Sequence, residues 1–237
     1  MLRSTRDLHG YKVHATDGEA GHLGQFYFDD QTWKVRYIVV NVGNWLHRKE
    51  VLISPRSITK VDDFDNTIRT TLTTEQILNS AGTYTHKPVA FQQPTDIPIY
   101  FGWPPYYSPG GSNIDVDSAS ENDPHLRTTE VVGGYHIMAA DSEVGHIEDF
   151  IVDDQTWKIL YAVADTRIWW PGKKVLLATD WISWLSQAEF NAYVNVLRER
   201  IVSAPEFDSE QPLTRDFEIK LYTHYKRLPY WEQKSMA

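Results

Sequence analysis

The hexapeptide Asp-Asp-Gln-Thr-Trp-Lys occurs twice in the chain, first at Asp29–Lys34 and again at Asp153–Lys158. The same offset, 153 − 29 = 124 residues, aligns Gly10–Tyr107 with Gly134–Trp231 without a gap. About a quarter of the aligned positions are identical, and self-similarity over segments of this length indicates two copies of one fold.

The segment between the copies, residues 108–132, is polar and rich in Gly, Pro, Ser and Asp. Such a composition cannot bury a core, so we interpret it as an exposed linker. The predicted domains are residues 1–107 and residues 133–237, each with an extension at its C-terminal end. Residues 1–118 carry 11 basic and 13 acidic residues (11 − 13 = −2), and residues 119–237 carry 12 and 19 (12 − 19 = −7), so the second half is the more acidic.

The composition of the 237 residues excludes several classes of function. There is no Cys, which excludes disulfides, thiolate catalysis, iron–sulfur clusters and Cys-ligated zinc. The net charge of −9 argues against binding to duplex nucleic acid, which requires a basic face. No apolar run approaches the roughly 20 residues of a membrane-spanning helix, and the first residues lack the apolar core of a secretory signal. We therefore expect a cytoplasmic protein without a transmembrane segment, either free or peripheral to the inner membrane.

Within each copy, short apolar and aromatic segments alternate with turn-forming residues, a pattern typical of strands in a small barrel or sandwich. Leu23–Phe28 and Trp33–Val42 are predicted to form a hairpin around the turn at Asp29–Thr32. Further strands are expected at Lys49–Ile53 and Thr67–Leu72, and at the corresponding positions of the second copy. The predicted fold is mainly all-β, with two small antiparallel β-barrels in tandem, each followed by a short helix and a tail.

One segment gives conflicting signals. Residues 186–202 have apolar side chains at helical spacing, namely Phe190, Val194, Leu197 and Ile201. The repeat, however, aligns Asn191–Val196 with the strand-like Thr67–Leu72. We give the repeat precedence, because homologous copies share a fold, and we expect a helix only at Leu197–Ser203. In the aligned helix of the first copy, Thr73 and Gln76 are predicted to form a capping box.

Each copy ends in a segment rich in Pro and aromatic residues, Ile99–Tyr107 and Thr223–Trp231. Aromatic side chains at this density require a surface to bury against. We expect the two tails to pack either across a barrel or against the other copy.

The repeat unit has a characteristic order of motifs. In the first copy, Asp17-Gly-Glu-Ala-Gly-His22 precedes an aromatic strand and an acidic turn, and Trp33-Lys-Val-Arg-Tyr-Ile-Val39 follows. Asn44-Trp-Leu46 and Lys49-Glu-Val-Leu-Ile-Ser-Pro55 complete the pattern. This order resembles the PRC-barrel family, named for the cytoplasmic domain of the photosynthetic reaction centre H subunit. The resemblance covers residues 8–60 and 132–183, and it implies in each copy a small, strongly bent antiparallel barrel of about six strands.

The resemblance is specific for the fold and says less about function. The family includes the H-subunit domain, the C-terminal domain of the ribosome-maturation factor RimM and many stand-alone bacterial proteins. This chain lacks the membrane helix of the H subunit, and a second copy stands where a RimM-like N-terminal domain would be. No motif matches the proton-pathway residues of the H subunit, so that role is assigned to no residue here.

Candidate chemical groups are few. His9 and His14 become Gly and Met in the second copy, and only His22 repeats, as His146, whereas a metal site needs three or four converging ligands. The paired acids at residues 29–30 and 153–154 lie at predicted hairpin turns, where Asp is favoured because its side chain bonds the turn backbone. No nucleophile elbow, zinc-binding helix motif or phosphate-binding loop is present. We therefore predict no catalytic residue, no metal and no cofactor, and a protein that is not an enzyme.

The nine Trp residues are a high number for a chain of 237 residues, and they say more about function than the His and Asp residues do. Aromatic side chains in loops and tails are costly to solvate and often mark contact surfaces. The candidate interaction surface consists of Trp45, Trp103, Tyr106, Trp169, Trp170, Tyr230 and Trp231.

The function that fits best is a non-enzymatic module for protein interaction or assembly in the bacterial cytoplasm, similar to the H-subunit cytoplasmic domain. Its expected partner is an unidentified protein, for which a membrane-associated complex is one candidate, and a homo-oligomer is compatible with the sequence. One alternative is a soluble sensor that binds a ligand or metal in the inter-barrel cleft. The other is an accessory to a membrane electron-transfer complex.

Overall fold

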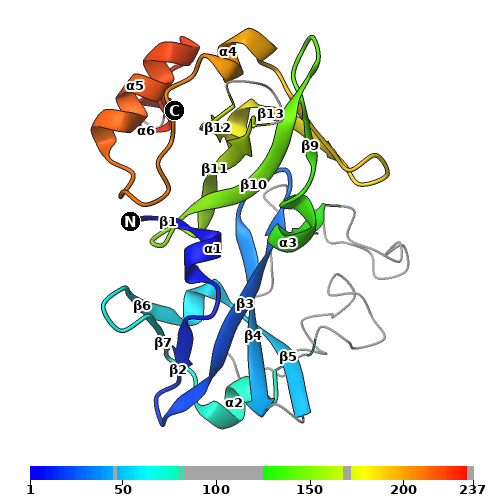
Figure 1. Ribbon diagram of the computed structural model, residues 1–237. Coiled ribbons are helices and arrows are strands. Elements are labelled where there is room, and N and C mark those ends of the chain that lie inside the picture. The colour runs from blue at the N-terminus through cyan, green and yellow to red at the C-terminus, as the bar shows by residue number, and fades with distance from the viewer. Residues whose placement is uncertain (45–46, 81, 83–124, 168–171, 234–237) are drawn as a thin grey trace. The chain divides into compact units, whose positions relative to one another are not determined.

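The computed structural model describes residues 1–44, 47–80, 82, 125–167 and 172–233 (Figure 1). The chain forms two compact units, and each of them contains residues from both sequence copies. One unit, which we call the C-unit, contains Met1–Asp7, Asp30–Lys34 and Thr129–Ala237. The other, which we call the N-unit, contains Leu8–Asp29 and Val35–Thr128.

The N-unit is built on one seven-stranded sheet. Six of its strands follow the order β5-β4-β3-β2-β7-β6, and β8 pairs with β3. The pairs are antiparallel apart from β2 with β7, which is parallel. The strands are β2 (Lys12–His14), β3 (Glu19–Asp29), β4 (Val35–Asn44), β5 (His47–Ile53), β6 (Ile58–Asp62), β7 (Thr67–Thr70) and β8 (Leu126–Thr128), with the 3-10 turn η1 (Pro55–Ser57) before β6 and helix α2 (Thr74–Leu78) after β7.

The C-unit repeats this architecture. Its sheet follows the order β12-β11-β10-β9-β14-β13, with β1 paired to β10, and β14 is again parallel to β9. Its strands are β1 (Leu2–Ser4), β9 (His136–Met138), β10 (Glu143–Asp153), β11 (Lys158–Asp165), β12 (Lys174–Ala178), β13 (Ile182–Ser186) and β14 (Asn191–Val194). Its helices are α3 (Thr129–Val132), η5 (Thr179–Trp181), α4 (Arg198–Val202), α5 (Arg215–Tyr225) and α6 (Tyr230–Gln233). The predicted mainly-β fold with two copies is confirmed. The barrels were predicted to be antiparallel, whereas each sheet contains one parallel pair, β2 with β7 and β9 with β14.

The segment with conflicting signals is a strand, as the repeat predicts. Residues Asn191–Val194 form β14 and align with β7 after a shift of 124 residues. Ala192 and Val194 are buried while Tyr193 between them is half-buried, which is the two-residue period of a strand. The helix that follows, α4, aligns with α2, and the predicted capping box of Thr73 and Gln76 is present. Packing against β9 therefore overrides the helical spacing of the apolar residues.

The end of the segment interpreted above as a linker is ordered, since Leu126–Thr128 form β8 and Thr129–Val132 form α3, and these residues align with residues 2–8 at the repeat offset. With them counted in the second copy, the first strand of each copy belongs to the unit built mainly from the other copy. In the C-unit, Leu2 of β1 lies opposite Asp153 of β10. In the N-unit, Leu126 of β8 lies opposite Asp29 of β3. The two pairings have the same register after the shift of 124 residues, and short helices follow both strands, α1 (Thr5–Leu8) and α3. Each sheet is therefore completed by a strand from the other copy.

Both hexapeptide turns end on a buried Trp in the left-handed conformation. Trp33 has φ 56° and Trp157 has φ 53°, values that are uncommon for a bulky side chain. The strand predicted from Trp33 therefore begins two residues later, at Val35, because positive φ cannot continue a strand. In the C-unit the Trp33 carbonyl accepts a hydrogen bond from the N–H of Ile159 at 2.7 Å, and its ring centroid lies 6.3 Å from that of Phe150.

The Gly-His motif of each copy marks a close approach between two strands. A Cβ atom at Gly21 would lie 2.2 Å from the carbonyl oxygen of Asn41, and one at Gly145 would lie 2.1 Å from that of Asp165. No side chain fits at such distances, so glycine is required at this position in both sheets.

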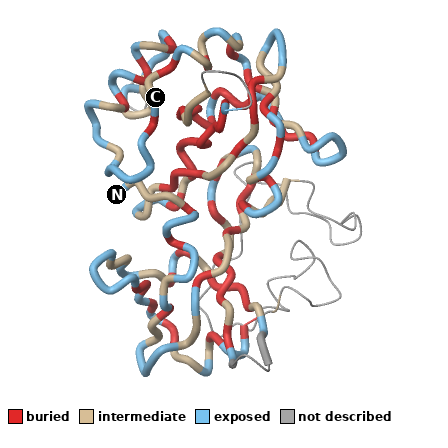
Figure 2. The backbone as a smooth tube through the Cα atoms, viewed as in Figure 1, coloured by how far each residue is buried: buried red, intermediate tan, exposed pale blue. Residues whose placement is uncertain are grey.

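Equivalent positions of the two copies supply the buried apolar side chains (Figure 2). These positions lie on the strands and on the apolar face of the short helix after β7 or β14. In the N-unit they include Val13, Leu23, Phe26, Val51 and Ile77, and in the C-unit Ile137, Ile147, Phe150, Val175 and Ile201. The repeat therefore sets which positions are buried, and at these five positions the two copies carry the same or closely similar apolar side chains.

The second tail, Thr223–Trp231, begins in the last turn of α5 and ends in α6, and neither helix was predicted from the sequence. Residues 215–225 form α5, whose first turn is capped by the Thr214 hydroxyl, which accepts a hydrogen bond from the N–H of Phe217. The aligned residues of the first copy, 91–101, contain two Pro residues, so comparison of the copies gives no support for a helix here. The tail packs across its own barrel, since the ring of Tyr225 lies 4.4 Å from that of Trp181. The first tail, residues 99–107, lies outside the described residues.

Cutting the chain within residues 108–124 should leave the two halves associated, because each unit contains segments of both. A protease site inserted between Gly110 and Gly111 tests this expectation. After cleavage, the two fragments should co-elute in size-exclusion chromatography under native conditions and separate in denaturant. Separate elution under native conditions would show that the exchanged strands do not hold the halves together.

Candidate functional site

An exposed pair of stacked aromatic rings lies on the sheet of the C-unit. Trp184 of β13 and Tyr193 of β14 are cross-strand partners with ring centroids 4.5 Å apart and ring planes 1° from parallel. Trp184 is 53% exposed, so about half of its surface meets solvent. Tyr193 lies opposite Met138 of β9, which extends the surface to a third strand. We call these three residues the aromatic stripe.

Carboxylates border the aromatic stripe. The Tyr193 hydroxyl donates a hydrogen bond to Glu189 at 2.6 Å. Glu143, which lies opposite Met138, is 2.8 Å from the Nδ1 atom of His136. The face of an aromatic ring attracts cations, and nearby carboxylates add to that attraction. The stripe therefore suits a partner that combines apolar surface with positive charge.

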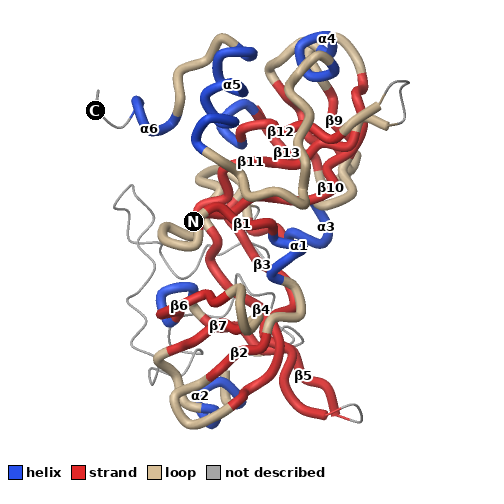
Figure 3. Tube along the Cα trace, turned by 60° about the vertical axis from the view of Figure 1, so that its left-hand side comes forward, coloured by secondary structure: helices blue, strands red, loops and turns tan. Residues whose placement is uncertain are grey.

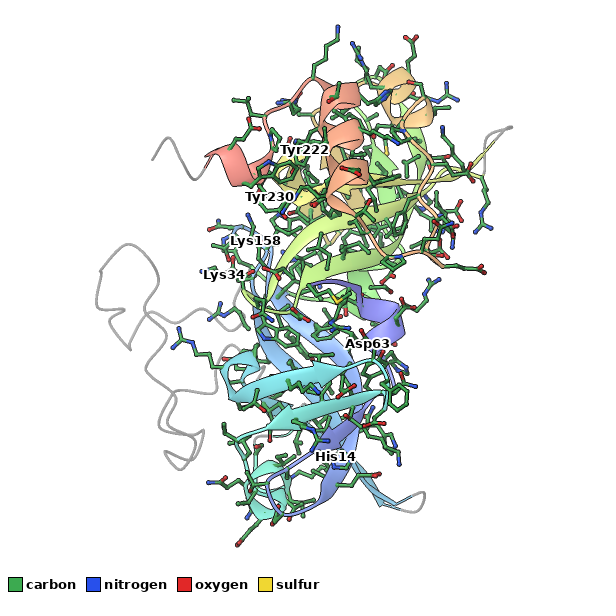
Figure 4. All side chains as sticks on the ribbon, turned by 90° about the vertical axis from the view of Figure 1, so that its left-hand side faces the viewer. His14, Lys34, Asp63, Lys158, Tyr222 and Tyr230 are labelled. Atoms are coloured by element: carbon green, nitrogen blue, oxygen red, sulfur yellow. The ribbon has the colours of Figure 1, made fainter. Side chains whose placement is uncertain are left out.

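The equivalent positions of the N-unit carry charged or basic side chains. Lys60, Arg69 and His14 align with the three residues of the aromatic stripe, and Figure 4 labels His14 on β2. The Nζ atom of Lys60 lies 2.5 Å from the carboxylate of Asp62, and the Lys60 side chain is 61% exposed. These are properties of a solvated face, where ion pairs contribute little. The aromatic stripe is thus a feature of the second copy that the first does not share.

The aromatic stripe lies outside the surface predicted from the sequence, which consists of loop and tail residues. A signal for it does exist in the repeat. At outward-facing strand positions, Lys60 and Arg69 of one copy align with Trp184 and Tyr193 of the other. Exchange of a charged residue for a large aromatic one at a solvent-facing position indicates a binding surface rather than a core.

Two residues of the predicted surface, Tyr230 and Trp231, lie on α6 and are half-buried against α5. The Trp231 ring centroid is 5.4 Å from that of Tyr222, and the Cζ atom of Arg215 is 3.9 Å from it. These contacts hold the end of the chain on α5. The other members of the predicted surface, Trp45, Trp103, Tyr106, Trp169 and Trp170, lie outside the residues whose side chains are described.

Helix α5 lies beside the strands of the C-unit (Figure 3), and a buried carboxylate fixes it there. Glu218 is 2% exposed, and one of its oxygens accepts a hydrogen bond from the Tyr161 hydroxyl of β11 at 2.7 Å. The other oxygen lies 3.0 Å from the Nη1 atom of Arg215. A buried carboxylate without partners is strongly destabilising, and here both oxygens are paired.

The tyrosines of this cluster are held in their neutral form. Burial raises the pKa of Tyr161 far above its ordinary value, and the nearby Tyr222 and Glu218 raise it further. Burial also raises the pKa of Tyr222 to about 12. Tyr161 is therefore a hydrogen-bond donor to Glu218 rather than a base, and the cluster serves to attach α5.

The paired acids of the second hairpin have separate roles. Asp153 accepts hydrogen bonds from the N–H of Gln155 at 3.2 Å and from the hydroxyl of Thr156 at 2.6 Å, as predicted for a turn. Asp154 instead accepts a hydrogen bond from the Nε atom of Arg3 at 2.6 Å. Among the described residues, no group of three or more His, Asp or Glu side chains is arranged to hold a metal ion. No helix in the described part of the chain has the length and apolar character needed to cross a membrane.

Comparison with known families finds a match in the first copy. Residues 2–77 match the family model described as PRC-barrel domain, a range that runs from β1 into α2. The first copy is therefore similar to a PRC-barrel domain. The second sheet has the same strand order as the first, which is consistent with two tandem PRC-type domains. A search of the curated proteins finds no match to the chain.

Replacing Glu218 with Ala should destabilise the protein, because the Tyr161 hydroxyl and the Arg215 guanidinium both lose their partner. The expected loss is about 1–3 kcal/mol of unfolding free energy, the usual cost of a buried polar group left unpaired. Glu232→Ala, an exposed carboxylate on α6, is the matched control and should cost less than about 0.5 kcal/mol. Chemical unfolding followed by circular dichroism compares the two, and equally small losses would contradict the role of Glu218.

The unfolding free energy should also fall as the pH rises above 10. Tyrosines of the unfolded chain lose their protons near pH 10, whereas Tyr161 and Tyr222 keep theirs to higher pH in the folded state. Their contribution is complete below pH 10 and is lost as the pH rises through the folded pKa values. Each group adds a slope of about 1.4 kcal/mol per pH unit.

Denaturant titrations at a series of alkaline pH values measure this slope. Tyr161→Phe removes one of the two groups and should make the slope shallower. An unchanged slope in that variant would show that Tyr161 titrates equally in the folded and unfolded chain.

Proposed function

We propose that this protein is a non-enzymatic module for protein interaction or assembly. The observation that carries the proposal is the aromatic stripe, in which Trp184 and Tyr193 stack on each other while Trp184 stays exposed and Tyr193 half-buried. Trp and Tyr are the residue types that most often dominate the binding energy of protein interfaces. Placed on two paired strands, they lose little conformational freedom when a partner binds, which favours affinity.

The partner is a protein surface that presents Arg or Lys side chains to the stripe. The residues bordering the stripe include Glu143 and Glu189, and the second half of the chain carries a net charge of −7 (12 − 19). A guanidinium stacks well on Trp and Tyr rings, and it gains further from nearby carboxylates. This combination favours a basic protein partner over an acidic one.

We place this role in the bacterial cytoplasm, free or at the inner membrane, in line with the resemblance to the H-subunit cytoplasmic domain. The role in an electron-transfer complex and the ligand- or metal-binding sensor stay alternatives that rest on the sequence. Neither is favoured by a specific contact among the described residues.

Replacing Trp184 and Tyr193 together with Ala should remove a specific partner without unfolding the protein, because both rings lie at the surface. The tagged chain is cross-linked in its native cells, and the captured proteins are quantified by mass spectrometry. Lys60→Ala, at the equivalent position of the N-unit, is the matched control and should retain the partner. The proposal fails if the folded double variant captures the same proteins in the same amounts as the unchanged chain.

A further inference from the structure

One carboxylate of β10 contacts three consecutive residues of the N-terminal segment. The Ser4 hydroxyl donates a hydrogen bond to Asp149 at 2.5 Å, and the Thr5 hydroxyl donates another at 2.7 Å. The backbone N–H of Arg6 donates a third, at 3.1 Å. The Ser4 oxygen also accepts a hydrogen bond from the N–H of Asp7, which caps α1. Asp149 thus recognises an extended strand that turns into a helix.

Ion pairs flank this carboxylate on both sides, formed by the two arginines described next, and the N-terminal amino group of Met1 also contacts Asp154. The Nε atom of Arg3 donates to Asp154 at 2.6 Å, and both side chains are nearly buried, at 11% and 6% exposure. Arg6 contacts Glu148 twice, through the carboxylate at 2.7 Å and through the backbone carbonyl at 2.9 Å. We call Glu148, Asp149 and Asp154, together with the β10 backbone, the strand slot.

The charge of Glu148 is maintained within the C-unit. Lys174 of β12 lies 2.9 Å from its second carboxylate oxygen. Burial raises the pKa of Glu148, but hydrogen bonds from Arg6 and Lys174 outweigh burial and lower that pKa below its ordinary value. The strand slot therefore carries a negative charge beside Arg6 at neutral pH.

The two exchanged strands are nearly the same in sequence. Residues 2–6 are Leu-Arg-Ser-Thr-Arg, and residues 126–130 are Leu-Arg-Thr-Thr-Glu. The Leu, the first Arg and the two hydroxyl positions are shared, so none of these can direct a strand to one sheet rather than the other. The remaining position differs in the sign of its charge, with Arg6 in one copy and Glu130 in the other.

The receiving strands differ at the matching place. Glu148 and Asp149 of β10 align with Gly24 and Gln25 of β3, which carry no charge. If residues 126–130 occupied the strand slot in the register of β1, Glu130 would lie beside Glu148 and the like charges would repel. The chemical difference that matches each strand to its sheet is therefore the charge at two positions. Arg6 of one strand faces Glu148, whereas Glu130 of the other strand aligns with Arg6 and belongs to a sheet that has Gly24 in place of Glu148.

We propose that the edge of β10 is a peptide-binding site selective for an extended segment of the form Leu-Arg-Ser-Thr-Arg, that residues 2–6 of the same chain occupy it, and that Glu148 and Arg6 determine the choice. The site binds by adding a strand to a sheet edge, a known mode of peptide recognition. It uses residues separate from the aromatic stripe, so it stands or falls independently of the proposed protein partner.

The selectivity expected from this pair is modest. Arg6 is 58% exposed, and ion pairs at such positions are partly screened by solvent. Attraction between Arg6 and Glu148 should raise the binding affinity of the matched strand by a factor of roughly three. Repulsion between Glu130 and Glu148 should lower the affinity of the mismatched strand by a similar factor, so the two strands should differ about tenfold in affinity.

Peptide binding to the full-length chain tests the site directly. Arg3→Asp places a carboxylate against Asp154 and should release residues 2–6 from the strand slot. A fluorescent, N-acetylated peptide of residues 2–8 should then bind this variant at least about tenfold more tightly than the unchanged chain. The same peptide with Arg6 replaced by Glu is the matched control and should bind about tenfold more weakly. With Glu148→Gln added to the variant, the two peptides should bind with nearly equal affinity.

The proposal is overturned if the folded Arg3→Asp chain binds neither peptide, or binds both equally while Glu148 is intact. A second measurement decides the matter if that variant fails to fold. Arg6→Glu should lower the melting temperature of the unchanged chain more than it lowers that of the Glu148→Gln chain. In the unchanged chain the new carboxylate at position 6 is repelled by Glu148, and in the Glu148→Gln chain this repulsion is absent. Equal shifts in the two backgrounds would show that Arg6 and Glu148 are not coupled and would also overturn the proposal.

Discussion

Backbone hydrogen bonding at two sheet edges is the constraint on which the rest of this structure depends. The edges of β10 and β3 both need a further strand, and each receives it from the other sequence copy. An unpaired edge would leave donors and acceptors free to join other chains, which natural proteins avoid. Because β1 and β8 are only three residues long, side chains must add to their attachment. The carboxylates of the strand slot provide that addition in the C-unit.

The duplicated fold lets two sheets with the same strand order carry different surfaces. Positions that fill the core keep their apolar character in both copies, since packing tolerates exchange of similar side chains. Positions that face solvent have diverged in charge and size, as Lys60 and Trp184 illustrate. The close approach at Gly21 and Gly145 has not diverged, because no other residue fits there. Divergence is therefore concentrated where it costs the fold least and can change binding most.

The C-terminal helix shows how a buried polar group can specify the placement of an element. Glu218 would be destabilising beneath α5 if Tyr161 and Arg215 did not pair with it. Their geometry fixes the helix on β11, and the Arg215 guanidinium also lies over the rings of Tyr230 and Trp231. Apolar contacts alone would allow more than one position, whereas the hydrogen bond and the ion pair favour one. The tail is thus part of the folded C-unit rather than a free peptide.

The sequence alone determined the two copies, the strands β3, β4, β5 and β7 with their counterparts, and the register between the copies, because a gapless offset of 124 residues aligns the strand and turn signals of one copy with those of the other. The same offset predicted that Asn191–Val194 form a strand, although the apolar residues of this segment have helical spacing. The helix α5 and the buried role of Glu218 were decided by packing against β11, which no local pattern encodes. The exchange of β1 and β8 was likewise decided only in three dimensions. Nearly identical strands, Leu2–Ser4 and Leu126–Thr128, could serve either sheet by their local sequence, and the partner of a strand is set by long-range pairing.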